Sequence, residues 1–143
     1  MITVAPEQMG DDFVISEKQI KYALGNKKRQ AVVIRTMPNL DYKRSKKYSD
    51  TNPTYLTEAA AKHLVKKGVE HLLVDLPSVD KERDGGELLA HKAFWNMNGR
   101  KRQKATITEF IYVPNPVEDG TYFLNLQVAP FENDASPSRP VLY

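Results

Sequence analysis

The side chains of this sequence that could carry chemistry are carboxylates, serines and histidines, because cysteine is absent. Asp75 ends an apolar run that starts at Val69, and Ser78 and Asp80 follow directly. If this run is a buried strand of an open α/β sheet, these groups lie at its carboxyl end, where active-site residues collect. Residues 77–80 also suit a turn in which Ser78 and Asp80 bond nearby backbone amides. For Ser78 and Asp80 we favour the turn, since a nucleophilic serine needs a base beside it.

The three histidines are His63, His71 and His91, and no two have the short spacing of a metal-binding pair on one helix or strand. His91 lies in LLAHKAFW, and a lone histidine beside Phe94 and Trp95 is typical of a partly buried surface residue. His63 falls opposite the apolar stripe of its predicted helix, and His71 begins a predicted strand. We therefore expect His63 and His71 to be structural or exposed.

Glu109 lies in the apolar run TITEFIYV, where a strand would give it the same side parity as Ile107 and Ile111. A carboxylate on a core face needs a partner. The partner could be a metal ion, His91 or a lysine from a loop, and an exposed edge position is a further alternative.

The elements that must position these residues alternate between helix and strand. Ser16 and Gln19 have the spacing of a capping box, and Gly25 with Asn26 supplies a left-handed stop, so a short helix is expected over residues 17 to 24. The continuous apolar run that begins at Ala31 predicts a central strand, covered on both faces and ending near Thr36.

A second helix and strand follow the polar stretch 38–54, which we expect to be a long loop. Thr57 can cap a helix that ends at Gly68, and residues 69–76 then predict a second buried strand. Strand, helix and strand make a crossover, so the two strands are expected to be parallel and the connection right-handed. This pattern is typical of the α/β class.

The C-terminal part predicts one more helix and two more strands. Residues 86–96 look helical, and residues 105–113 and 121–128 look like strands that pair as an antiparallel hairpin. The proline-rich tail 130–143 is expected to wrap the surface and to offer a short edge strand. The predicted fold class is therefore α/β, a mixed sheet with a parallel strand-helix-strand crossover and a C-terminal antiparallel hairpin.

Length and composition limit the function classes. A chain of 143 residues with 41% hydrophobic content predicts one domain over residues 1–143 with one core. The lack of cysteine excludes disulfides and thiolate sites and suits a reducing cytoplasm, where we expect the protein. Neither a signal peptide nor a membrane-spanning stretch is recognisable. A net charge of +3 is mild, so we interpret the basic runs as solvated loops and expect no nucleic-acid partner.

Three stretches together resemble the cyclase family of metal-dependent hydrolases, which includes kynurenine-formamidase-like enzymes. They are AVVIRT at 31–36, GVEHLLVDLPSVD at 68–80 and DASPSRPVL at 134–142. The second is similar to the family's glycine, buried strand and Asp-x-Pro-Ser-x-Asp signature, and the third to its Asp-Ala-Ser-Pro-x-Arg ending. The likeness runs from Ala31 to Leu142 and corresponds to the C-terminal half of such a protein, which implies a truncated cyclase-like fold of the swivelling α/β type.

The resemblance implies a metal site. Family members place a histidine in the helix after the Pro-Ser-x-Asp element and a glutamate in the next strand, and His91 and Glu109 match these positions. In the family they complete a site for zinc or a similar divalent ion such as manganese, and Asp75 would lie next to it. The other ligands come from an earlier His-x-Gly-Thr-His-x-Asp-x-Pro motif, which this chain does not contain.

The function implied is hydrolysis of an amide, formamide-like or cyclic acyl carbon–nitrogen bond through metal-activated water. The alternative is a catalytically inactive cyclase-fold fragment or oligomerisation domain that lacks the main metal-binding motif. In either case, without an N-terminal half, strand edges and apolar faces would be uncovered, so we expect a homo-oligomer, a dimer or larger.

Overall fold

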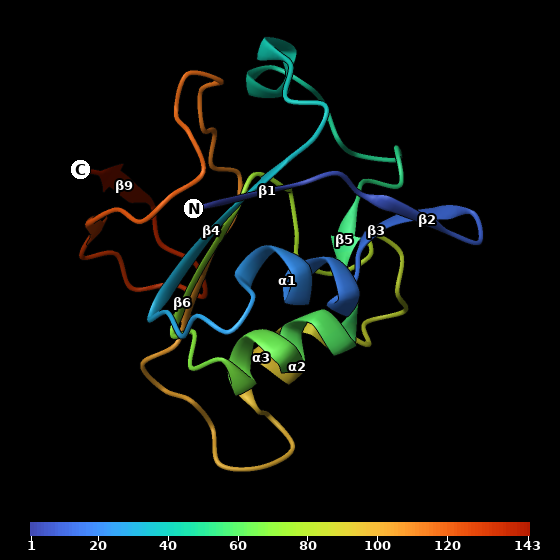
Figure 1. Ribbon diagram of the computed structural model, residues 1–143. Coiled ribbons are helices and arrows are strands. Elements are labelled where there is room, and N and C mark those ends of the chain that lie inside the picture. Colours follow the sequence, from blue (N-terminus) through green and yellow to red (C-terminus); the bar gives the residue numbers. More distant parts are fainter.

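The computed structural model describes all residues 1–143, and its centre is a parallel sheet (Figure 1). The sheet has the strand order β1-β4-β6-β7 and every neighbouring pair is parallel. Its strands are β1 (Ile2–Val4), β4 (Ala31–Thr36), β6 (His71–Val74) and β7 (Thr106–Thr108). The two longest of these, β4 and β6, pair from Ala31 opposite His71 to Ile34 opposite Val74. The predicted crossover with parallel strands is therefore confirmed.

Three helices gather on one face of this sheet: α1 (Glu17–Leu24), α2 (Glu58–Lys66) and α3 (Leu89–Trp95) (Figure 1). Val32 and Ile34 of β4 point into the main core, as do Leu72 and Val74 of β6. The helices complete this core with a larger set of side chains: Ile20, Leu24, Ala60, Ala61, Leu64, Ala90 and Phe94. Burying so much apolar surface against the sheet supplies the main stabilisation of this layer.

The opposite face of the sheet has a much smaller core of Val33, Leu73 and Val113. It is covered by a hairpin of β8 (Leu124–Val128) and β9 (Ser138–Leu142), which pair antiparallel from Leu124 opposite Leu142. The predicted C-terminal antiparallel hairpin is present, but its partners differ from those expected. Residues 106–108 join the parallel sheet beside β6, and the tail supplies the strand that pairs with β8.

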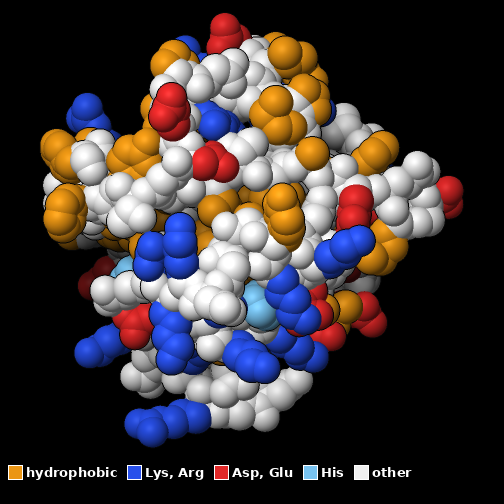
Figure 2. All heavy atoms as spheres, in the orientation of Figure 1, with side chains coloured by type: hydrophobic (Ala, Val, Ile, Leu, Met, Phe, Trp, Pro, Cys, Tyr) orange, Lys and Arg blue, Asp and Glu red, His pale blue; other side chains and the backbone are white.

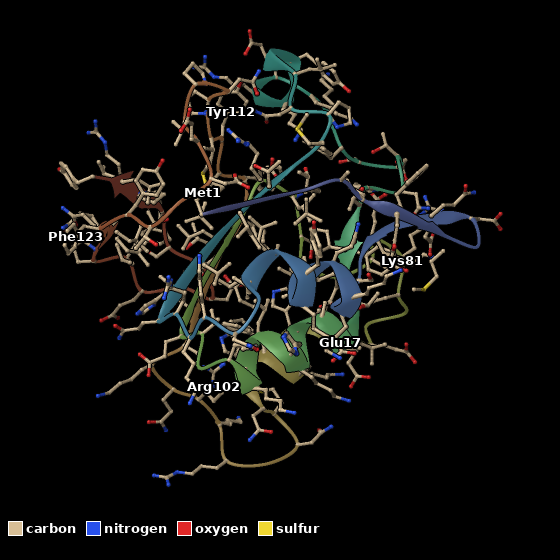
Figure 3. The ribbon with its side chains drawn as sticks, viewed as in Figure 1. Met1, Glu17, Lys81, Arg102, Tyr112 and Phe123 are labelled. Atoms are coloured by element: carbon tan, nitrogen blue, oxygen red, sulfur yellow. The ribbon has the colours of Figure 1, made fainter.

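A small second sheet was not predicted. It contains β2 (Glu7–Met9), β3 (Asp12–Ile15) and β5 (Tyr55–Leu56), with β2 antiparallel and β5 parallel to β3. Asp12 of this sheet accepts hydrogen bonds from Asn52, Tyr55 and Lys81, and Figure 3 shows Lys81 beside these strands. These bonds fasten the loop after β6 to the small sheet.

The helix ends agree with the capping patterns. Ser16 Oγ accepts from the Gln19 amide at 3.4 Å while the Gln19 side chain accepts from the Ser16 amide at 3.0 Å, the reciprocal bonding of a capping box. Thr57 Oγ1 accepts from the Ala60 amide at 3.2 Å. Within the long loop lies a short 3-10 helix, Asp41–Arg44. None of the helices combines the length and the apolar character needed to cross a membrane.

Several predicted elements are shorter than expected, among them the strand predicted over 69–76, and two of the interruptions have a local cause. The third helix begins at Leu89, because Leu88 is left-handed with φ of 48° and Asp84 holds the preceding turn by accepting from the Gly86 and Leu88 amides. The strand expected over 105–113 ends at Thr108, since Phe110 has φ of 56°, outside the β region. Both interruptions lie where the candidate site is built.

Candidate metal centre

Three segments bring the candidate site together at the carboxyl end of the parallel sheet. Asp80 lies in the loop after β6, His91 in the first turn of α3, and Glu109 directly after β7. Carboxyl ends of parallel strands meet at one edge, so residues distant in sequence can converge there. His91 lies between the two carboxylates, and its side chain is largely buried.

Asp80 joins the helix start to the imidazole. Its carboxylate accepts from the Ala90 amide at 2.5 Å and from the His91 amide at 3.3 Å. Leu88, the residue before the helix, has an apolar side chain that cannot accept these bonds. The Asp80 Oδ2 atom also lies 2.6 Å from His91 Nδ1. One carboxylate therefore caps α3 and orients the ring of His91, leaving Nε2 on the other side.

Glu109 faces that other side. Its Oε1 atom lies 3.6 Å from His91 Nε2 and accepts from the Val79 amide at 2.9 Å. The prediction that Glu109 shares a face with Ile107 and Ile111 is wrong. Ile107 packs on the helix side of the sheet and Ile111 on the hairpin side, because the left-handed backbone at residue 110 breaks the alternation.

The charges of the three groups depend on one another. Burial opposes ionisation of Asp80, but hydrogen bonds from His91 and from the Ala90 amide outweigh it and lower the Asp80 pKa. Burial also opposes the imidazolium, yet the bond to Asp80 and the charge of Glu109 raise the pKa of His91 above its ordinary value. For Glu109 burial dominates and raises the pKa, although the Val79 amide partly offsets it.

His91 and Glu109 fit part of the coordination shell of a divalent ion. Zinc lies about 2.0–2.2 Å from imidazole nitrogen and carboxylate oxygen, so two ligand atoms separated by 3.6 Å can bind the same ion. The Nδ1–H to Asp80 bond is the outer contact that metal-binding histidines usually make. A zinc site needs at least three protein ligands, however, and no group of three His, Asp or Glu side chains in the chain is arranged to hold a metal.

Asp75 lies in a separate cluster. Its side chain is buried, and both of its oxygens accept from the Thr36 amide, at 3.0 and 2.9 Å. Lys43 Nζ lies 2.9 Å from Asp75 Oδ2 and also donates to the Thr36 carbonyl at 2.6 Å. Asp75 thus ties the ends of β4 and β6 to the long loop. It borders a cavity of about 120 Å³ that none of Asp80, His91 and Glu109 lines.

The remaining sequence candidates have structural partners. Ser78 Oγ accepts from the Asp80 amide at 3.1 Å, the turn contact that we favoured. His71 Nδ1 lies 3.0 Å from Thr106 Oγ1 at the opposite end of the sheet from His91. His63 is buried between α1 and α2, where its Nδ1 is 3.7 Å from Glu17. Neither histidine touches the candidate centre, whereas Ser78 contacts both Asp80 and Glu109 and so supports the centre from its edge.

The sequence interpretation missed the contact between Asp80 and His91. Asp80 was interpreted as a turn residue, and its bond to the imidazole crosses from one loop to the next helix. No local spacing rule marks this bond. A weak signal was present in α3 itself: Leu88 cannot cap the helix, so an acceptor from elsewhere in the chain was required.

The chain belongs to the Cyclase family, described as "Putative cyclase", which matches residues 1–81. The match contains AVVIRT and the segment up to Asp80, and it also includes the N-terminal residues before Ala31 that we had left outside the resemblance. His91, Glu109 and the tail lie beyond it, so their family roles depend on the resemblance alone.

Solved structures share the fold. A "predicted metal-dependent hydrolase from Bacillus stearothermophilus" superposes on 99% of this chain with a TM-score of 0.66 and 19% identity. A "potential metal-dependent hydrolase with cyclase activity" superposes equally well, with 18% identity over 99% of the chain. This chain spans 61% and 62% of the lengths of those two structures. Among curated proteins no match was found.

Proposed function

We propose that this chain carries part of the active site of a metal-dependent hydrolase that cleaves an amide, formamide-like or cyclic acyl carbon–nitrogen bond. The observation that supports this proposal is that Asp80, His91 and Glu109 lie in a row. Asp80 orients the imidazole, and Glu109 Oε1 lies 3.6 Å from its free nitrogen, Nε2. Membership of the Cyclase family and the likeness to two structures described as metal-dependent hydrolases support metal-dependent hydrolysis, and the carbon–nitrogen bond is our proposal.

The roles of the residues follow from their contacts. When bound, a divalent ion such as zinc or manganese lowers the pKa of a coordinated water and polarises the acyl carbonyl. His91 would hold the ion through Nε2, because its Nδ1–H is already donated to Asp80. Glu109 would hold it through a carboxylate whose position is restricted by the Val79 amide. Trp95 packs beside the imidazole at 5.1 Å between ring centroids and limits its rotation.

Further ligands are needed, since two residues do not hold a catalytic ion tightly. We propose that they come from a second subunit or from another polypeptide segment that docks beside His91. The incomplete ligand set also favours a second candidate function, a domain that retains the cyclase fold and the capacity to assemble but not the reaction.

Elemental analysis after extensive dialysis tests the proposal. We expect near-stoichiometric zinc or manganese in the native protein and its loss in His91→Ala and in Glu109→Gln. His71→Ala is the matched control, because His71 is a second partly buried histidine at the other end of the same sheet. Absence of bound metal from the native protein would rule out a metal site assembled by copies of this chain alone and favour the non-catalytic domain.

We also propose that the chain self-associates through the β8–β9 hairpin. Hydrophobic side chains gather over this hairpin at the left of Figure 2, and Phe123 stands at this side in Figure 3. The exposed fractions are 84% for Phe123 and 73% for Tyr143, and Val128 and Phe131 are more than half exposed. Several large apolar side chains exposed on one element are typical of an interaction surface.

A further inference from the structure

A cavity of about 440 Å³ opens beside the candidate metal centre. Its walls include Ser78 and Asp80 from the loop after β6, Phe110 after β7, and Lys46 and Tyr48 from the long loop. This volume is within the range of about 300–1,000 Å³ that small-molecule sites occupy. Ser78 and Asp80 contact the residues of the centre directly, so a ligand in this cavity lies next to it.

The acidic side chains that line the cavity are all engaged with donors of the protein. Asp80 binds His91 and the start of α3. Glu82 accepts from the Asp50 amide at 2.6 Å and the Asn52 amide at 3.1 Å. Asp84 accepts from the amides of the turn before α3, and the cavity's second lysine, Lys81, is paired with Asp12 at 2.7 Å.

Lys46 is the cation of the cavity that has no carboxylate partner. Its Nζ atom lies over aromatic rings, 5.0 Å from the centroid of Tyr48 and 5.9 Å from that of Tyr42. Lys46 and Tyr48 also border the adjoining cavity of Asp75, where Lys43 is already taken by the buried ion pair. Amide bonds do not remove the charges of Asp80, Glu82 and Asp84, so an anion is favoured only at the Lys46 end of the larger cavity, at its boundary with the smaller one. Asp80 lies on the wall that adjoins His91.

Two aromatic side chains give the cavity an apolar wall. Tyr48 and Phe110 meet edge to face with ring centroids 6.0 Å apart. Phe110 is 67% exposed, and its backbone is held by a bond from its amide to the Leu76 carbonyl at 2.9 Å. The Tyr48 hydroxyl makes no side-chain hydrogen bond within the chain, and burial raises the Tyr48 pKa, so the hydroxyl stays protonated and can donate.

We infer that Lys46 is a specificity-determining residue, which selects substrates with a carboxylate attached to a planar apolar body. The ammonium and the Tyr48 hydroxyl bind the carboxylate, and the planar part lies along Tyr48 and Phe110 toward Asp80 and His91. Charge-assisted hydrogen bonds of this kind are about twice as strong as neutral ones, which makes the anion the main source of selectivity. The term substrate rests on the proposed function, whereas the inference itself concerns only the binding of a carboxylate.

Benzoate is a suitable probe because it joins one carboxylate to one flat ring, and benzamide has the same shape without the charge. Binding of each is measured by calorimetric titration and by saturation-transfer NMR, with the full chain stripped of metal by a chelator. Native protein is expected to bind benzoate at least about tenfold more tightly than benzamide. Lys46→Met should abolish this preference and Lys46→Arg should keep it. Lys47→Met is the matched control, since Lys47 is exposed and does not line the cavity.

Equal binding of benzoate and benzamide, no binding of benzoate at millimolar concentration, or unchanged benzoate affinity in Lys46→Met would each overturn the inference. Because the titrations use protein without metal, these results are independent of the metal analysis of His91→Ala. A chain that binds benzoate through Lys46 but never holds a metal would retain the recognition site and lose only the proposed reaction.

Discussion

Asp80 Oδ2 lies 2.6 Å from His91 Nδ1, and the same carboxylate accepts the Ala90 amide at the first turn of α3. The orientation of the imidazole is therefore coupled to the formation of the helix that carries it. A single negative group does both, since Leu88 gives α3 no side-chain cap. Binding of any ligand at Nε2 of His91 thus depends on Asp80, which orients the ring from its other side.

Asp80→Asn tests this coupling. Asparagine keeps an acceptor for the helix amides but removes the charge that stabilises the imidazolium, so the pKa of His91 should fall, as measured by NMR titration of its ring protons. If the chain holds metal, its affinity should drop about 10- to 100-fold, the usual effect of losing such a contact. Asp84→Asn is the comparison, because Asp84 also caps the turn before α3 but acts on His91 only through its charge, so its loss should lower the His91 pKa less than the loss of Asp80 does. A His91 pKa equal to that of the native protein would contradict the coupling.

The parts of the fold that the sequence predicts correctly are those with local signals. The capping box of Ser16 and Gln19 and the cap at Thr57 fix the starts of α1 and α2 within a few residues of chain. The apolar runs of β4 and β6 predict buried strands because these strands are covered on both faces. Each of these decisions depends on neighbours in sequence, which is the information that a single sequence contains.

The errors concern pairing and direction, which depend on distant residues. Both Thr106–Thr108 and Ser138–Leu142 are short strands that could pair in several ways, and only the packing against β6 and β8 decides between them. In the candidate site, Glu109 was found through the family resemblance, but the direction of its side chain follows from the left-handed backbone of Phe110. Nothing in the composition of the TITEFIYV run indicates that break.

The buried pair of Lys43 and Asp75 should be important for stability. The two side chains are 13% and 1% exposed, so Lys43→Met leaves a buried carboxylate without its counter-charge. Breaking a buried pair in this way typically costs about 3–5 kcal/mol, and the Thr36 amide that remains bonded to Asp75 favours the lower end. Urea unfolding measures the loss. Lys47→Met, an exposed lysine of the same loop, should change the free energy of unfolding by less than about 0.5 kcal/mol. Similar midpoints for both variants would show that the pair contributes little.

Because the side chain of His63 is buried, we expect the protein to be less stable in acid. Its side chain is 7% exposed, its Nε2 has no hydrogen-bond partner, and burial lowers its pKa despite the nearby Glu17. Lys21, Lys66 and Lys67 oppose its protonation further. Because the folded-state pKa is below the unfolded value of about 6.5, protons favour the unfolded chain. The contribution of His63 to stability is therefore complete above the unfolded value and is lost as the pH falls from there through the lower folded-state pKa.

His63→Gln isolates this contribution. Urea unfolding at pH 7.5 and at pH 5 should show a larger loss for the native protein than for the variant, since glutamine does not titrate. His71→Gln serves as control, because His71 is only partly buried and bonded to Thr106. Equal pH dependence of the native protein and His63→Gln would mean that His63 is accommodated in either charge state.

The hairpin surface predicts self-association that one substitution can reverse. Phe123 is 84% exposed on the hairpin side, and its backbone is bonded to Tyr143 in both directions at 3.0 Å, so these two apolar residues stay together. Burying them between two chains removes apolar surface from water, whereas an aspartate there would place a charge in the contact. We expect a dimer or larger species by light scattering for the native protein and a monomer for Phe123→Asp.

Phe13→Asp is the control, because Phe13 is also more than half exposed but lies on β3, at the opposite side of the molecule (Figure 1). A native monomer, or a Phe123→Asp variant that still associates, would contradict self-association through the hairpin.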